Sequence, residues 1–125
     1  MRYLLDTHTL LWYFQNDENL TQKVREIIDR EECYVSLISI WEIAIKQSIG
    51  KLKYSKSIRE IVELISKAGF NLINFSDEEC DLIKQLPFYH KDPFDRMLIA
   101  QAKLKELVIL SKDEFIPKYP VDVVW

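Results

Sequence analysis

Short apolar runs alternate with stretches of helical periodicity along the whole chain. The apolar runs predict five short strands, at residues 3–5, 33–36, 70–75, 107–110 and 121–125. Apolar positions spaced three and four residues apart predict the helices between them, at residues 20–28, 39–49, 58–65, 76–86 and 93–106. Asn16-Asp17 is a plausible cap for the first of these helices. Gly50 and Gly69 follow two others, at places where a left-handed backbone ends a helix.

Strands that alternate with helices are typical of an α/β fold, in which helices cover both faces of a parallel sheet. The 125 residues fit a single domain over residues 1–125, and no linker, repeat or low-complexity segment divides them. In such sheets, ligands bind beyond the carboxyl ends of the strands, where the strand order reverses. Residues that directly follow a strand are therefore the first candidates for function.

The composition narrows the class of protein. Hydrophobic residues make up 48% of the chain and glycine is scarce, so a packed core is expected rather than disorder. The formal net charge of −3 does not indicate a strongly basic nucleic-acid-binding domain. Four lysines in the middle of the chain form either a local basic rim or an ordinary solvated surface. They are Lys46, Lys51, Lys53 and Lys56.

Several features favour a protein of the cytoplasm without a membrane segment. No apolar stretch approaches the ~20 residues needed to span a membrane. Asp6 and His8 interrupt the early apolar run, so no cleavable signal peptide is expected. Cys33 and Cys80 match no metal-binding spacing, and both are expected to be small buried residues in a reducing compartment.

Asp6 follows the first predicted strand and is the only formal charge between Tyr3 and Phe14. A carboxylate in apolar surroundings needs hydrogen bonds, a charge partner or a cation to offset its desolvation. The structural alternative is a cap for the next helix, shared with Thr7 or Thr9. We favour the functional interpretation.

Glu42 is the lone acid of a predicted helix that is apolar nearly all round, so this helix is expected to be buried. One alternative is a capping box with Ser39, and another is a helical pair with Lys46 four residues on. The capping-box alternative is serious because the same Ser-x-x-Glu spacing recurs at Ser57/Glu60, Ser76/Glu79 and Ser111/Glu114.

Two acids open the last predicted helix, in the block Asp92-Pro93-Phe94-Asp95-Arg96. Asp92 suits the N-cap, Pro93 suits the first helical position, and Asp95 suits the favourable end of the helix dipole. Two acids followed by Arg96 are also suited to hold a cation and to touch a phosphate. We predict Asp95 as a metal ligand and Asp92 as a cap or a support for the ligands.

Asp113 follows the fourth predicted strand, and alone it would be interpreted as a turn acid or a cap. In a parallel sheet, however, Asp6, Glu42, Asp95 and Asp113 all lie at one edge, two after strands and two in first turns of helices. Four acids there would repel one another without a cation among them, and hard oxygen ligands suit Mg²⁺ or Mn²⁺. Such ions polarise phosphate and activate water, so the pattern predicts phosphodiester hydrolysis.

Other chemistry has little support, because the chain has no Gly-rich phosphate loop, no GxSxG elbow and no zinc motif. Two alternatives stay open: a non-catalytic module that binds nucleic acid or protein, and a phosphatase acting on small phosphoesters. His8 is expected to bond or pack locally, and His90 either contacts substrate or lies in a surface loop. The three tryptophans are interpreted as core or interface residues rather than a base-stacking platform.

Four segments resemble, in order, the PIN-domain family, specifically the VapC-like toxins of bacterial toxin–antitoxin pairs. They are Leu-Leu-Asp-Thr-His at 4–8, Ser-Ile-Trp-Glu-Ile-Ala-Ile-Lys at 39–46, His-Lys-Asp-Pro-Phe-Asp-Arg-Met-Leu-Ile-Ala-Gln-Ala at 90–102 and Leu-Ser-Lys-Asp at 110–113. The Asp-Pro-Phe-Asp-Arg block, with the helix that follows it, is the most specific part.

The resemblance implies a PIN-like three-layer fold and a Mg²⁺- or Mn²⁺-dependent endoribonuclease. It matches Asp6, Glu42 and Asp95 to the core acids and Asp113 to a more variable fourth acid. It further implies a homodimer silenced by a cognate antitoxin. Basic residues nearby are expected to position the RNA backbone. Residues expected to contact substrate or to support the ligands are Thr7, Ser39, Lys46, Asp92, Arg96 and Ser111.

Overall fold

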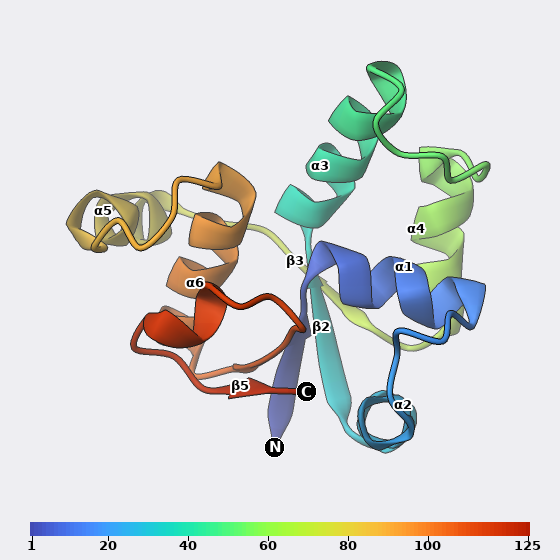
Figure 1. Ribbon diagram of the computed structural model, residues 1–125, viewed down its shortest axis with the longest axis horizontal. Helices are drawn as coiled ribbons and strands as arrows, with labels where there is room; N and C mark the ends of the chain where they lie inside the picture. Colours follow the sequence, from blue (N-terminus) through green and yellow to red (C-terminus); the bar gives the residue numbers. More distant parts are fainter.

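Five parallel strands form one sheet in the order β3-β2-β1-β4-β5 in a computed structural model that describes residues 1–125 (Figure 1). The strands are β1 (Arg2–Leu5), β2 (Glu32–Ser36), β3 (Asn71–Ile73), β4 (Val108–Leu110) and β5 (Val123–Val124). The chain builds outward from β1 through β2 and β3, and then returns to the other side of β1 with β4 and β5. The strand order therefore reverses between β1 and β4, and the predicted α/β fold is confirmed.

Six α-helices and one 3-10 turn connect the strands: α1 (Thr7–Gln15), α2 (Gln22–Arg30), α3 (Leu37–Ser48), α4 (Ile58–Lys67), α5 (Asp77–Gln85), α6 (Pro93–Lys105) and η1 (Ile116–Lys118). Figure 1 shows α1, α2 and α4 on one side of the sheet and α5 and α6 on the other. None of these helices is long and apolar enough to cross a membrane.

Two hydrophobic cores lie on the two faces of the sheet. Tyr3 and Leu5 of β1 pack into a core that also contains residues of α1, α2 and α4. Leu4 points the opposite way, into a second core built largely by α6, to which β4 contributes Ile109. Burial on both faces explains why the central strands are continuous apolar runs. These two cores hold the ends of β1 and β4, after which Asp6 and Asp113 follow.

The helix that carries Glu42 starts earlier than the sequence predicts. Ser36 caps it, because its Oγ accepts a hydrogen bond from the Ile38 amide at 3.1 Å. Glu42 consequently lies in the second turn, so both its predicted first-turn position and the Ser39 capping box are wrong. The helix is also not buried all round, since Trp41 is 59% exposed.

Other local predictions had mixed outcomes. Capping boxes form at Ser57/Glu60 and Ser76/Glu79, and Gly50 and Gly69 have the expected positive φ angles, of 71° and 77°. Thr21 caps α2 in place of Asn16-Asp17, because α1, which the apolar pattern did not separate, occupies the residues up to Gln15. Cys33 is buried as expected, whereas Cys80 is exposed, which corrects the prediction for that residue.

Candidate metal centre

The four predicted acids lie around the carboxyl ends of β1 and β4, the two strands between which the strand order reverses. Asp6 and Asp113 follow these strands directly or within three residues, and the Asp6 amide donates a hydrogen bond to the Leu110 carbonyl at 3.2 Å. The helices α3 and α6 start at the same edge of the sheet (Figure 1). This is the edge at which open parallel sheets bind ligands.

Asp6 is a buried carboxylate with both oxygens held by the chain. Its Oδ1 accepts a hydrogen bond from the Thr9 amide at 2.8 Å, so it caps α1, and its Oδ2 accepts one from the Ser111 hydroxyl. Burial raises the pKa of Asp6 above its ordinary value, although these hydrogen bonds act in the opposite direction. The capping and functional interpretations of Asp6 are therefore compatible, because the cap leaves a desolvated negative charge that a cation would stabilise.

Ser111 connects the ends of the two central strands. While its hydroxyl donates to Asp6, it accepts a hydrogen bond from the Asp113 amide at 3.0 Å. Asp113 Oδ1 in turn accepts from the amides of Phe115 and Ile116 at 2.7 and 3.3 Å. Asp113 is thus a turn acid whose second oxygen accepts no hydrogen bond from the chain.

Glu42 is 4% exposed and lies within reach of α1. Its Oε1 accepts a hydrogen bond from the Thr7 hydroxyl at 2.6 Å, and the same hydroxyl lies 2.9 Å from the Ser39 hydroxyl. Its Oε2 forms an ion pair with the Lys46 ammonium, the predicted pair four residues apart. Burial lowers the pKa of Lys46, but the hydrogen bond and charge of Glu42, together with more distant acids, outweigh it, so the net shift is upward.

Asp95 is the most perturbed carboxyl of the cluster. Burial, followed by the charges of the neighbouring acids, raises its pKa to about 8. Those neighbours, in order of effect, are Asp92, Asp113, Asp6 and Glu42. The amides of Phe94 and Asp95 donate to Asp92, which therefore caps α6 as predicted. These four neighbouring charges indicate a concentration of negative charge at this edge, which a cation or a proton on Asp95 would relieve.

His90 lies closer to the acids than the sequence indicated. Its Nε2 is 3.1 Å from Asp95 Oδ2, its Nδ1 is 2.9 Å from the Tyr119 hydroxyl, and its ring stacks on Phe115. Potential ligand atoms of His90, Asp95 and Asp113 all lie within 4.8 Å of one another. The loop that carries His90 has no periodic pattern that would predict its contact with Asp95. The only signal in the sequence is that His90 lies two residues before Asp92.

The carboxylates of this cluster fit Mg²⁺ or Mn²⁺, which prefer hard oxygen ligands. The structure brings Asp95, Asp113 and His90 together most closely. Asp6 and Glu42 lie near enough to repel Asp95, but their oxygens are held by Ser111, Thr9, Thr7 and Lys46. The side chains fit a divalent cation by their chemistry.

Arg96 does not lie where a phosphate contact would need it. It is 4% exposed, and its guanidinium donates to the carbonyls of Pro87, Ile83 and Leu86 and to the Tyr119 hydroxyl at 2.7–3.3 Å. These bonds use its two terminal nitrogens to hold the loop between α5 and α6. The expectation that Arg96 positions the RNA backbone is therefore corrected: this residue supports the loop that carries His90.

Arg96→Leu is expected to lower the free energy of unfolding by about 2–4 kcal/mol, because several buried carbonyls lose their donor. Urea unfolding followed by circular dichroism would measure this change. Arg59→Leu, at an exposed position of α4, is the matched control, and we expect a change within about 0.5 kcal/mol. An Arg96→Leu protein with unchanged stability would contradict the structural role.

A family model of the PIN domain matches residues 3–121. The chain therefore belongs to the PIN domain family, and the predicted family is confirmed. No curated protein matches the chain in sequence.

Solved structures extend the comparison across the whole chain. A structure described as VapBC2 from Rickettsia felis bound to a promoter DNA fragment aligns with a TM-score of 0.74 at 12% identity, over 100% of this chain and 99% of the other. FitAcB from Neisseria gonorrhoeae aligns with a TM-score of 0.68 at 19% identity, over 98% of this chain and 96% of the other. A toxin–antitoxin complex from Klebsiella pneumoniae aligns with a TM-score of 0.67 at 20% identity, over 98% of this chain and 96% of the other. At these identities the likeness shows a shared fold.

Proposed function

We propose that this protein is a metal-dependent endoribonuclease, which hydrolyses phosphodiester bonds in RNA as the toxin of a toxin–antitoxin pair. One observation carries the proposal: four carboxylates gather where the strand order reverses, and burial, together with the charges of Asp92 and of the other three acids, raises the pKa of Asp95 to about 8. Crowded acids of this kind are unfavourable without a cation, and sites with perturbed pKa values are frequently catalytic.

Asp6, Glu42, Asp95 and Asp113 would hold the Mg²⁺ or Mn²⁺ ion. When bound, such an ion polarises a phosphate and lowers the pKa of water. The chain's own contribution is to fix the carboxylates: Ser111 and the Thr9 amide orient Asp6, Thr7 orients Glu42, and His90 orients Asp95. Lys46 neutralises Glu42 and lies beside the acids, where its ammonium would also serve a backbone phosphate.

The proposed partners follow from the structural relatives. The descriptions of the R. felis and K. pneumoniae structures name VapBC and toxin–antitoxin complexes. We extend this to a cognate antitoxin that binds and silences the present chain, and to a homodimer of the toxin. A small protein encoded beside this one would be the first antitoxin to test.

Purified protein is expected to cleave a mixed pool of structured RNA with Mg²⁺ or Mn²⁺, and to lose this activity in excess chelator. Gel electrophoresis of end-labelled RNA over a metal titration would measure it. Glu42→Gln should reduce cleavage, whereas Asp81→Asn, which removes an exposed acid of α5, should not. Cleavage that persists at full rate in chelator would contradict a metal-dependent site.

A further inference from the structure

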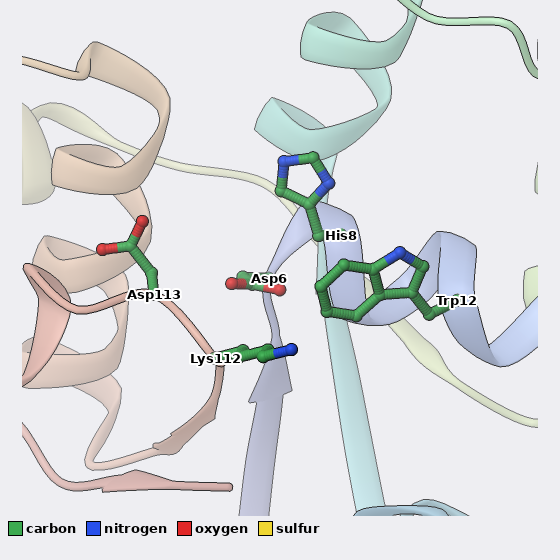
Figure 2. Close-up of a pocket in the computed structure, with 5 residues that line it drawn as sticks. All are labelled: Asp6, His8, Trp12, Lys112 and Asp113. Carbon is green, nitrogen blue, oxygen red and sulfur yellow. The ribbon is translucent and has the colours of Figure 1, made fainter. Parts of the chain in front are cut away.

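A pocket of about 300 Å³ opens beside the acids and is lined by Asp6, His8, Trp12, Lys112 and Asp113. Figure 2 shows His8 and Trp12 on one side of it and Asp113 on the other, with Asp6 and Lys112 between them. One part of the wall is therefore acidic and belongs to the candidate metal centre. The other part is aromatic and basic, and the proposed hydrolysis alone does not require it.

The aromatic wall is a fixed pair of rings. His8 and Trp12 lie one turn apart on α1, with ring centroids 5.6 Å apart and planes inclined by 30°. Trp125 packs against Trp12 edge to face at 5.8 Å, which holds the indole in place from another side. The His8 side chain is exposed and its ring forms no hydrogen bond within the chain, so its ring nitrogens are free to meet a ligand.

Lys112 supplies a cation at the same pocket. Its ammonium donates to the Asn19 side-chain carbonyl at 3.1 Å and lies 5.9 Å from the centre of the Trp12 ring. It forms no salt bridge, although Asp6 and Asp113 line the same pocket. An ammonium held over an aromatic ring and unpaired with an acid is available to an anionic ligand.

We propose that His8, Trp12 and Lys112 form a subsite for one unpaired nucleotide of the RNA, next to the phosphate that is cleaved. The base stacks on the aromatic wall, and Lys112 contacts the adjoining phosphate. The inference rests on the proposed function, since it assumes that the scissile phosphate lies at the acids. It also revises the expectation that all three tryptophans are only core or interface residues.

The chemistry of the pocket favours a nucleotide over a protein side chain. Its size is at the lower end of ligand pockets, about 300 Å³, which suits one ring system rather than a larger molecule. A basic side chain of a partner would be attracted by Asp6 and Asp113 but repelled by Lys112. A nucleotide offers a flat base to the rings and a negative phosphate to the ammonium. Because a paired base keeps its stack within the duplex, the subsite selects single-stranded RNA.

Nuclear magnetic resonance can test the subsite without any cleavage. Adenosine 5′-monophosphate, titrated with Mg²⁺ present, is expected to shift the Trp12 indole and His8 ring signals. Ribose 5-phosphate lacks the base and should leave both signals in place, and Trp41, exposed on α3, is the internal control. No shift with the nucleotide at saturation would overturn the proposal. A shift with a short arginine peptide alone would overturn it too, and would assign the pocket to a protein partner.

Kinetics on a cleaved RNA gives the second test. His8→Ala and Lys112→Gln, both at exposed positions that should not disturb folding, are expected to raise KM roughly five- to hundredfold with a smaller change in kcat. Lys118→Gln is the matched control, because Lys118 also lies over an aromatic ring, that of Phe115. An abasic nucleotide beside the cut should weaken binding to the unmodified protein and have little further effect in His8→Ala.

The two tests separate this subsite from the proposed nuclease. If the nucleotide shifts the Trp12 and His8 resonances but the protein cleaves no RNA, the subsite is supported and the nuclease proposal is contradicted. If His8→Ala and Lys112→Gln leave metal-dependent cleavage unchanged and the nucleotide shifts no resonance, the subsite is contradicted and the nuclease proposal is supported.

Discussion

Asp6→Asn is expected to lower metal-dependent RNA cleavage by at least about a hundredfold, since changes to residues that merely support metal ligands already cost 10–100-fold. The fold should persist. An asparagine keeps the volume of Asp6 and still accepts the Thr9 amide as a helix cap. Burial raises the pKa of Asp6, so losing its charge removes an unfavourable buried anion from the metal-free protein.

Cleavage rates at several Mn²⁺ concentrations, together with thermal unfolding in chelator, would check this expectation. Asp81→Asn is the control for loss of one negative charge at an exposed position. Full activity in folded Asp6→Asn protein would remove Asp6 from the metal centre. Loss of activity with a much lower melting temperature would instead show that the fold depends on the Asp6 carboxylate, which contradicts the expected stability of this variant.

The fold could be predicted from the sequence because strands that are buried on both faces of a sheet are continuous apolar runs, which are easily recognised. Leu107, Val108, Ile109 and Leu110 could hardly form anything but a central strand, and β4 covers the last three of them. The start of α3 was missed because Ser36 belongs to the strand pattern and to the cap at once. The shift mattered, since it removed the capping-box interpretation of Glu42.

The site was harder to predict than the fold. The ends of β1 and β4 and the first two turns of α3 and α6 place the four acids at one edge, and the order of the strands makes that edge a candidate ligand site. The partners of those acids depend on loops without a periodic pattern. Arg96 was expected to contact a phosphate because it is charged. Instead, its buried guanidinium donates hydrogen bonds to three backbone carbonyls. His90 reaches the site through a loop contact that no local spacing encodes. Trp12 lines the pocket through α1, the helix that the apolar pattern did not separate.

The stability of the metal-free protein should depend on pH through Asp95. Its pKa is about 8 in the folded chain against an ordinary value of 3.8, so above pH 4 the folded state retains a proton that the unfolded state loses. The stability that this proton confers is complete below about pH 3.8 and is lost as the pH rises towards 8. Within that window the loss approaches about 1.4 kcal/mol per pH unit.

Asp95→Asn removes this titration, so the comparison between the two proteins isolates it from the other ionisable groups. In chelator, the free energy of unfolding of the unmodified protein should fall relative to Asp95→Asn as the pH rises from about 4 to 8. Added Mn²⁺ should reverse the trend, because a cation binds the ionised carboxylates and stabilises the folded state more at higher pH. Urea titrations at four or five pH values would measure both effects. If the difference in the free energy of unfolding between the two proteins stays constant from about pH 4 to 8, Asp95 is already ionised at the lower end of this range. Lys46 and His90 of the chain itself would then neutralise the crowded acids.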